Sequence, residues 1–319
     1  MTNNPFPYAI DNLRYHSFDY YLKTTYHSKV MKVPLDAGFT CPNRDGTVAI
    51  GGCTFCSSEG SGEMISNKSL SLLDQYYKNK ALMSLKWPEA KTIPYFQAYS
   101  NTYDNLDNLK NRYELFLNLP EVVGIAIATR PDCLNPEIVA YLVELATKID
   151  IYLELGLQTI HEATASAINR GYNLMTFQEA YQLVKDTPLK LCVHIINGLP
   201  NETPSMMLET TKYLSQLKLH SLKIHMLHLL SDSKLGQAYL EDPWPLLELK
   251  DYVELVVAQL EILPADLVIQ RLTGDGYLNK LIAPQWTTKK TITLNEIQKL
   301  LIKKDSYQGI HYQDKRKKA

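Results

Sequence analysis

The stretch "DAGFTCPNRDGTVAIGGCTFCSSEGSGE", residues 36–63, holds three of the five cysteines of the chain. Cys41, Cys53 and Cys56 form the pattern C-x11-C-x2-C, in a segment rich in Gly, Ser, Asn and Asp that is typical of a loop. An apolar segment, residues 30–37, precedes it and is typical of a strand. Because α/β folds place their sites at the carboxyl ends of strands, this loop is the first candidate for a functional site.

Three thiols on one loop favour an iron–sulfur cluster over a structural zinc ion. Three cysteines can bind three irons of a [4Fe–4S] cluster and leave the fourth iron open to a ligand. A structural zinc site uses four protein ligands, commonly as two C-x2-C pairs, and this loop contains no histidine and no fourth cysteine. We therefore expect Cys41, Cys53 and Cys56 to be the metal ligands, with zinc as the alternative. Cys133 and Cys192 are expected to be ordinary buried cysteines.

Composition indicates an ordinary globular protein. Of 319 residues, 45% are hydrophobic and 21% are charged, and the formal net charge is -1, which draws the chain neither toward nucleic acid nor away from it. The sequence shows no secretion signal and no apolar run as long as a membrane span. An odd number of cysteines without such a signal favours a reducing compartment, so we expect a cytoplasmic protein with no membrane partner.

Short apolar strands alternate with amphipathic helices along the chain, which predicts a parallel sheet of about six strands. The predicted strands are residues 30–37, 92–99, 123–130, 151–158, 189–197 and 221–229, and the predicted helices are 69–86, 106–118, 135–148, 161–185 with a break, and 204–218. Thr203 and Pro204 form a clear helix start, as N-cap and first helical residue.

The chain divides into three predicted segments. Residues 1–29 form an N-terminal lead-in, residues 30–235 the core, and residues 236–319 a C-terminal extension. The extension contains a helical pattern at 246–262, a short strand at 267–271 and a basic tail.

Several predicted strands alternate apolar with polar side chains. Leu222, Ile224 and Met226 alternate with Lys223 and His225, and residues 151–158 and 189–197 show the same pattern. Successive side chains of a strand point to opposite faces, so one face packs on helices and the other lines something polar. We expect a sheet curled into a partial barrel around a ligand, with an open sheet that has one wet face as the alternative.

The cysteine loop, with Phe55 just before its last cysteine, resembles that of the radical S-adenosylmethionine (SAM) superfamily. The usual spacing in that superfamily is C-x3-C-x2-C. The longer first gap of this chain resembles the spacing in a subgroup related to the catalytic subunit of Elongator and to oxygen-independent coproporphyrinogen oxidase. Further motifs carry the resemblance: "TRPD" (129–132), "ELGLQT" (154–159), "INRGY" (168–172), "GLPNET" (198–203), "TGDG" (273–276) and "LIAPQW" (281–286).

The resemblance implies an α/β fold, a partial (β/α)6 radical SAM barrel with a small C-terminal extension, and an enzyme that uses a [4Fe–4S] cluster to cleave S-adenosylmethionine to a 5′-deoxyadenosyl radical. It assigns SAM contacts to Gln158 and Arg170, where the arginine fork suits the methionine carboxylate. For Arg170 the alternative is a surface residue at a helix end.

The same resemblance places other residues near SAM. Gln97 or Ser100, in "FQAYSNT", would contact the amino group, although the Gly-Gly-Glu usual in relatives is absent. The backbone at Asn197 and Gly198 would approach the adenine or ribose, and Phe55 belongs to the cluster loop.

Two residues are catalytic candidates, each with a structural alternative. Glu154 lies on the same strand face as Gln158, but it could instead be a structural carboxylate paired with Lys190 or Lys223. His225, like His194, could be a histidine of the core.

Three functions stay open at this point. The resemblance favours modification of a tRNA base, at the side chain of a wobble uridine, with tRNA and an electron donor such as flavodoxin or ferredoxin as partners. A radical SAM enzyme for a small molecule such as a tetrapyrrole and a zinc-stabilised RNA-binding protein are the alternatives. The basic residues Lys303, Lys304, Lys315, Arg316, Lys317 and Lys318, together with "TTKKT" (287–291), favour RNA.

Overall fold

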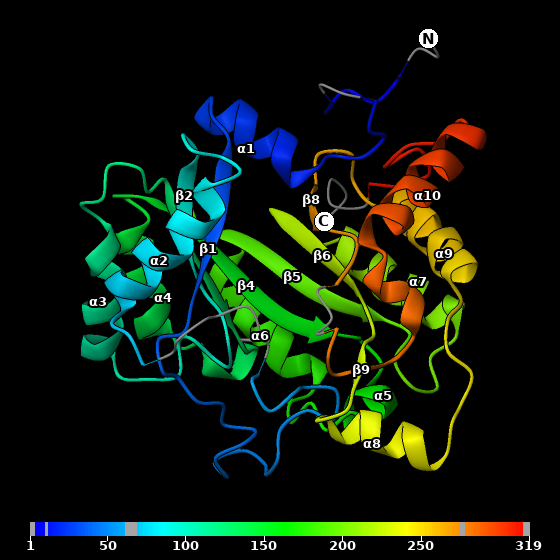
Figure 1. Cartoon of the computed structure of the whole chain (residues 1–319), viewed down its shortest axis with the longest axis horizontal. Coiled ribbons are helices and arrows are strands. Elements are labelled where there is room, and N and C mark those ends of the chain that lie inside the picture. The colour runs from blue at the N-terminus through cyan, green and yellow to red at the C-terminus, as the bar shows by residue number, and fades with distance from the viewer. Residues whose placement is uncertain (1–3, 10–11, 61–68, 275–277, 315–319) are drawn as a thin grey trace. The chain divides into compact units, whose positions relative to one another are not determined.

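The computed structural model describes residues 4–9, 12–60, 69–274 and 278–314 (Figure 1). Its main element is a seven-stranded sheet in the order β1-β2-β3-β4-β5-β6-β8. The strands are β1 (Val30–Leu35), β2 (Lys91–Phe96), β3 (Gly124–Thr129), β4 (Asp150–Gln158), β5 (Lys190–Asn197), β6 (Ser221–Met226) and β8 (Val268–Arg271). The pairs β1–β2, β2–β3, β3–β4 and β6–β8 are parallel. This confirms the predicted α/β class with a parallel sheet.

Helices connect the successive strands. They are α1 (Phe18–Tyr26), α2 (Leu72–Ser84), α3 (Leu106–Tyr113), α4 (Pro136–Leu145), α5 (Glu162–Ala167), α6 (Leu174–Val184), α7 (Pro204–Ser215), α8 (Lys234–Glu241), α9 (Leu249–Ile262) and α10 (Lys290–Lys303). Short 3-10 turns lie at η1 (Glu114–Phe116), η2 (Pro131–Cys133) and η3 (Gln285–Thr288). The hydroxyl of Thr203 accepts from the Met206 amide, so α7 begins where the sequence predicts.

The C-terminal region is more structured than predicted. The short strand predicted at 267–271 is β8, which joins the main sheet beside β6 as its seventh strand. Two short strands, β7 (Leu229–Leu230) and β9 (Leu281–Ala283), pair antiparallel in a separate sheet. Helix α10, which lies before the predicted basic tail, was not predicted; it forms because Thr293, Ile297 and Leu301 recur every fourth residue and bury one face.

The chain forms two compact units, and the division runs through β4 and β5. We call Leu22–Gly156 with Gly171–Cys192 the cysteine-loop unit, and Met1–Tyr21, Leu157–Arg170 and Val193–Ala319 the C-terminal unit.

The N-terminal segment is part of the C-terminal unit. The buried guanidinium of Arg14 lies 2.9 Å from the Asp305 carboxylate, and the His16 amide donates to the Gln308 side chain at 2.9 Å. Residues from the two ends of the sequence therefore pack together within one unit.

The polar strand faces are buried in part. In β4, Tyr152 and Glu154 are as buried as their apolar neighbours, and in β6 Lys223 is only 6% exposed. Charged side chains in such surroundings need partners, so these faces carry interactions that a solvent-exposed sheet would not need.

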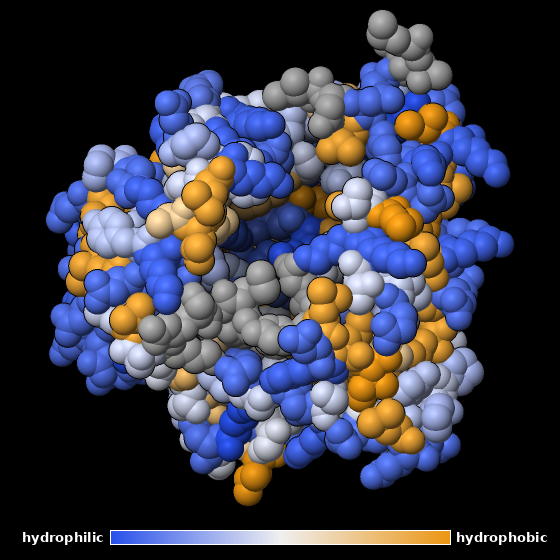
Figure 2. Space-filling view, viewed as in Figure 1, coloured by the Kyte–Doolittle hydropathy of each residue, from blue (hydrophilic) through white to orange (hydrophobic). Residues whose placement is uncertain are grey.

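The described surface is mixed in character. On the face in Figure 2, hydrophobic side chains form separate groups among hydrophilic ones. None of the helices in the described ranges is both long and apolar enough to cross a membrane.

Candidate functional site

The long gap between the first two cysteines is a closed hairpin. The Val48 amide donates to the Pro42 carbonyl at 2.8 Å, and the Gly52 amide donates to the Asn43 carbonyl at 2.7 Å. Asp45 and Ile50 form an antiparallel bridge further out. The hairpin therefore returns the chain to its starting point, which brings Cys53 back beside the segment that begins at Cys41.

The three thiols influence one another electrostatically. Cys56 donates a hydrogen bond to Cys53, which lowers the pKa of Cys53 to about 7, with further help from the charges of Arg130 and Arg44. The same hydrogen bond, together with burial and the nearby Cys41, raises the pKa of Cys56. The Asn43 side chain also donates to the Cys53 sulfur, with 3.5 Å between Nδ2 and Sγ. The surroundings thus favour the thiolate, the form that binds metal, at Cys53.

Arg130 of the motif "TRPD" supplies positive charge to this loop. It is buried and binds Asp132 through two contacts, Nε–Oδ1 at 2.9 Å and Nη2–Oδ2 at 2.6 Å. Its guanidinium also lies 4.8 Å from the centre of the Tyr172 ring. The two-pronged ion pair fixes the orientation of Arg130, so its charge acts on the thiols from a defined position.

The motif "INRGY" supports the loop from the other side. Gly171 has φ +82°, and a Cβ there would lie 2.4 Å from Oδ1 of Asn43, which is closer than any real contact. Only glycine allows Asn43 to keep the position from which it binds Cys53. The hydroxyl of the next residue, Tyr172, donates to the Gly156 carbonyl at the end of the β4 portion of this unit.

The donor set fits a [4Fe–4S] cluster better than zinc. Within the described residues, the three Sγ atoms do not all lie within 4.8 Å of one another, whereas tetrahedral zinc would hold its sulfur ligands about 3.8 Å apart. Cys41, Cys53 and Cys56 surround a larger group more readily than one ion, and the amide of Asn43 is the kind of N–H donor that iron–sulfur sites use toward sulfur.

The segment after β2 has the backbone that glycines usually provide. Ala98 and Tyr99 have φ +70° and +59°, in the left-handed region that non-glycine residues seldom adopt. Ser100 follows them, fully buried, and its amide donates to the Thr40 carbonyl next to Cys41 at 3.2 Å. This segment thus adopts, without glycine, backbone angles that glycine adopts most readily. Gln97 and Phe55 are both half-buried in the same unit.

The strained conformation at two consecutive residues has local support. The Tyr99 hydroxyl donates to the Ser58 carbonyl at 2.9 Å, and the guanidinium of Arg44 lies 5.3 Å from its ring centre. Backbone strain concentrates at functional sites, where the surroundings hold it in place. The strain and its supports therefore agree with a binding role for this segment, and the SAM contacts of Gln97 and Ser100 stay predictions.

Glu154 forms an ion pair with a residue that the sequence did not indicate as its partner. Its buried carboxylate binds the ammonium of Lys32 on β1, while Lys190 pairs with Asp150 at 3.3 Å. Lys32 also lies 4.8 Å from the centre of the Tyr95 ring. Glu154 is therefore held as a carboxylate against a cation, and a catalytic role for it stays a prediction.

In the C-terminal unit, Arg170 supports the turn at Gln158. Gln158 ends β4 with φ +64°. Nη1 of Arg170 donates to the carbonyl oxygens of Leu157 at 2.7 Å and Thr159 at 2.6 Å, on either side of Gln158. Arg170 is 1% exposed, which excludes the alternative of a surface residue at a helix end.

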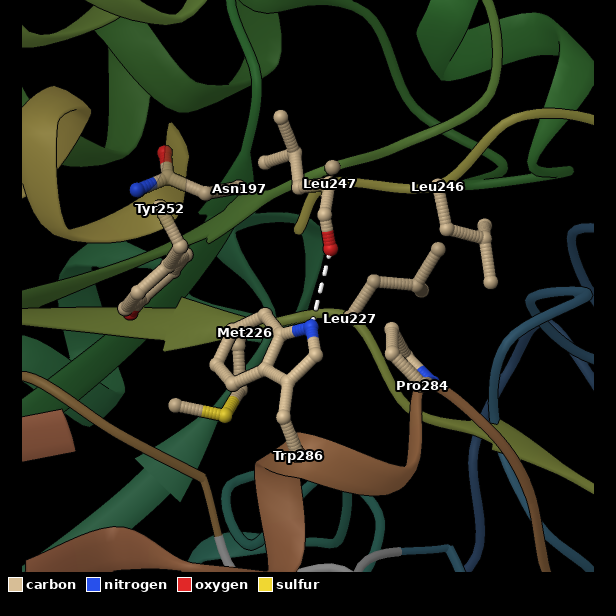
Figure 3. A pocket seen from close by; sticks show the side chains of 9 residues that line it. Asn197, Met226, Leu227, Leu246, Leu247, Tyr252, Pro284 and Trp286 are labelled. Atoms are coloured by element: carbon tan, nitrogen blue, oxygen red, sulfur yellow. Dashed lines mark hydrogen bonds between the residues drawn. The ribbon is translucent and has the colours of Figure 1, made fainter. Parts of the chain in front are cut away.

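Asn197 and Gly198 lie at the end of β5, beside a small apolar pocket (Figure 3). The Asn197 amide points away from the pocket and exchanges two hydrogen bonds with Gln259, at 2.8 and 3.0 Å. The opposite side holds the indole of Trp286, which donates to the Leu247 carbonyl at 2.9 Å. The Asn197 side chain is thus structural, and the approach of the Asn197 and Gly198 backbone to adenine or ribose stays a prediction; Gly198 has φ +89°.

Each unit thus collects its own set of predicted residues. The cysteine-loop unit holds Cys41, Cys53, Cys56, Phe55, Gln97, Ser100 and Glu154, and the C-terminal unit holds Gln158, Arg170, Asn197, Gly198 and His225. The sequence did not identify Asn43, Lys32 or Arg130 as site residues, although the motif "TRPD" marked the position of Arg130.

Comparison with known proteins agrees with this geometry. A model of the radical SAM superfamily matches residues 41–214, and a model of the radical SAM C-terminal domain matches residues 219–303. The uncharacterized protein YtqA of Bacillus subtilis is 45% identical over 313 residues, which cover 98% of this chain and 97% of that protein.

Similarity to Elongator proteins is more local in sequence. Elongator complex protein 3 of Schizosaccharomyces pombe is 40% identical over 80 residues, or 25% of this chain and 14% of that protein. The structure of the archaeal Methanocaldococcus infernus Elp3 with an N-terminal deletion has a TM-score of 0.67 and 15% identity, and the match covers 88% of this chain and 64% of that one. The latter likeness establishes a shared fold.

Proposed function

The chain belongs to the radical SAM superfamily, and from this premise we propose that it is an enzyme that modifies a base of tRNA, at the side chain of a wobble uridine. The observation that carries the enzymatic part is the cysteine loop, in which three thiols lie on one closed loop and the Asn43 amide and the Arg130 guanidinium favour the thiolate of Cys53.

The residues have separable tasks in this proposal. Cys41, Cys53 and Cys56 would bind the [4Fe–4S] cluster, which when bound supplies an open iron for S-adenosylmethionine and the electron that cleaves it to a 5′-deoxyadenosyl radical. Asn43 donates to the Cys53 sulfur and so orients that ligand. Gln158, held by Arg170, would contact SAM from the end of β4.

Two observations support tRNA as the substrate. The chain is locally similar to Elongator complex protein 3, and resemblance to the Elongator catalytic subunit is what implies modification of a tRNA base. Basic side chains also lie in the C-terminal unit, where Lys289 and Lys290 begin α10 and Lys303 ends it. Phosphate neutralisation by such residues supplies most of the non-specific affinity for RNA. Reduced flavodoxin or ferredoxin would be the electron donor, in a cytoplasmic setting.

A deletion strain tests the proposal directly. Mass spectrometry of total tRNA nucleosides should show the loss of one modified uridine, or the accumulation of its precursor, when the gene is deleted. Expression of the wild-type chain or of Cys133→Ala should restore the nucleoside, and expression of Cys53→Ala should not. An unchanged nucleoside profile would exclude the tRNA assignment and favour a small-molecule substrate.

A further inference from the structure

Basic and imidazole side chains gather on one side of the C-terminal unit. Lys223 and His225 lie two residues apart on β6 and therefore point to the same face. Arg271 on β8 is paired with Lys223 in the parallel register. His228 follows β6, and Lys290 is the first residue of α10.

The charges of these side chains reach one another. Burial lowers the pKa of His225 well below its ordinary value, and His194, Arg271 and Lys223 lower it further. Burial, Lys290 and Arg271 together lower the pKa of His228 to about 4. The rings of His194 and His225 are 5.2 Å apart, centre to centre. Both His225 and His228 are therefore neutral at physiological pH, surrounded by cations.

Two ring nitrogens in this group have unmet hydrogen-bonding capacity. Among the described residues, Nε2 of His225 and Nε2 of His228 are buried and have no hydrogen-bond partner. Buried polar atoms in folded proteins almost always have one, in the protein or in something bound to it. A ligand that accepts or donates at these nitrogens would satisfy both.

Gly274 shapes the group further. A Cβ at Gly274 would lie 2.3 Å from the His228 ring, so the chain after β8 packs directly against that imidazole. The motif "TGDG" thus contributes a close backbone approach that holds His228 in place; its residues 275 and 276 lie outside the described residues. A fixed imidazole is better suited to binding a ligand than a mobile one.

We propose that Lys223, Arg271, Lys290, His225 and His228 form a binding site for a phosphate group of the substrate. Three cationic side chains exceed what a single carboxylate, with one charge and one bidentate edge, requires. A terminal phosphate carries up to two charges, and the phosphodiester of RNA, with one, still presents tetrahedrally arranged oxygens that can accept from an arginine fork, lysine ammonium groups and imidazole N–H donors together. His225 then serves as a hydrogen-bond partner of the phosphate.

This assignment deepens the proposed function and rests on it for the nature of the substrate. A nucleotide turned out of an RNA loop would bring its own phosphate into the site together with its base. The site gives a role to the positive charges of Lys223, Arg271 and Lys290, which belong neither to the cysteine loop nor to the predicted SAM contacts.

Phosphate binding can be measured on the reconstituted protein with SAM present. Titration of inorganic phosphate, followed by calorimetry and by the imidazole 15N signals of His225, should give saturable binding to the wild type. Arg271→Gln and Lys290→Gln should each weaken it about tenfold or more, the effect of one charge-assisted hydrogen bond. Lys250→Gln is the matched control, because Lys250 is 84% exposed on α9 and pairs only loosely with Glu254, at 3.9 Å. Equal affinities for all four proteins would overturn the site.

Two further titrations identify the ligand. Acetate should bind at least tenfold more weakly than phosphate; equal affinity would replace the phosphate site with a carboxylate site. A single-stranded oligoribonucleotide should compete with inorganic phosphate in the wild type. Lack of competition would mean that the site takes a free phosphate and not one of RNA. If the wild type does not bind phosphate but the deletion strain has an altered tRNA profile, only the phosphate site is wrong. If the wild type binds phosphate but the deletion strain has an unchanged tRNA profile, only the tRNA function is wrong.

Discussion

Arg170 holds Gln158 from both sides. Its Nη1 donates to the carbonyl oxygens of Leu157 and Thr159, at 2.7 and 2.6 Å, and Gln158 between them has φ +64°. A glutamine in the left-handed region is strained by roughly 1 kcal/mol or more, and it persists because buried charge-assisted bonds fix its neighbours. The side chain of Gln158 therefore owes its position to Arg170.

Substitution of each partner separates positioning from contact. Arg170→Ala removes a charged donor from two buried carbonyls, of which that of Leu157 keeps the Thr159 amide, so the free energy of unfolding should fall by about 2 to 4 kcal/mol and SAM affinity by tenfold or more. Gln158→Gly removes the side chain but relieves the strain, so SAM affinity should fall while stability is kept or raised. Urea denaturation and SAM calorimetry on cluster-containing protein provide both values. If Arg170→Ala binds SAM as the wild type does, Arg170 has no role in the cofactor site.

The cluster ligands can be distinguished by single alanine variants. Cys41→Ala, Cys53→Ala and Cys56→Ala should each lose the iron–sulfur absorption and SAM cleavage, because three thiolates are needed to hold the cluster. Cys133→Ala and Cys192→Ala are matched controls, since both thiols are buried and lie outside the loop, and they should keep both properties. A Cys41→Ala protein that still binds about four irons per chain would remove Cys41 from the ligand set.

Gly171 offers a test of the support behind Cys53. Gly171→Ala places a methyl group against Asn43, so Asn43 has to move away from the sulfur it binds. We expect faster iron loss under air and a cluster content below that of the wild type, measured by iron assay after anaerobic reconstitution.

The control for this variant is Gly46→Ala. Gly46 also has a positive φ, +95°, but a Cβ there meets nothing within 4 Å, so the substitution adds backbone strain of about 1 kcal/mol without displacing a neighbour. Equal cluster loss in the two variants would mean that backbone strain, and not the contact with Asn43, is responsible.

Much of the fold follows from local patterns in the sequence. Residues 151–158 alternate apolar and polar side chains and form β4, and Thr203 caps α7 as predicted. Helix α10 was not predicted from the sequence, and the buried face of Thr293, Ile297 and Leu301 decides its structure. Charge marks where a segment meets water, but periodic burial determines whether it is helical.

Local sequence patterns likewise predict some residues of the site but not others. The three cysteines are visible because they are close in the sequence, and their spacing alone predicts a cluster. Arg130 and Asn43 act through contacts with residues distant in sequence, Tyr172 and Gly171, and no local pattern reveals such contacts. The contact between Glu154 and Lys32 was likewise not predictable, because Lys32 lies on β1, three strands from β4, with β2 and β3 between them.

The neutral histidines predict a stability that falls in acid. The pKa of His228 is lowered to about 4 in the folded protein, against about 6.5 when unfolded. Between these values the unfolded chain binds the extra proton, so the stabilisation is complete above pH 6.5 and is lost as the pH falls toward 4. The loss from His228 should be about 1 to 3 kcal/mol.

Urea denaturation at several pH values between 4 and 7 measures this slope. His228→Asn should flatten it, because asparagine does not titrate. His311→Asn is a suitable control, since His311 is exposed in the C-terminal unit. A slope that is the same in all three proteins would assign the acid sensitivity to other groups, such as ion-paired carboxylates.

RNA affinity should come from local positive charge, since the net charge of the chain is -1. Lys315, Arg316, Lys317 and Lys318 lie outside the described residues, while Lys304 is already paired with Glu261 at 3.1 Å. We expect tRNA to bind at low salt, with affinity that decreases linearly on a log–log plot against salt concentration.

Removal of residues 313–319 should reduce that slope by up to about four phosphate contacts, while SAM cleavage is kept. Lys304→Gln should leave the slope nearly unchanged because its ammonium already has a carboxylate partner. Filter binding at salt concentrations between about 50 and 300 mM measures the slopes. The Debye length, over which salt screens charges, is about 10 Å at 0.1 M. An affinity that is independent of salt, or no binding to tRNA by a chain that cleaves SAM efficiently, would leave a small molecule as the substrate.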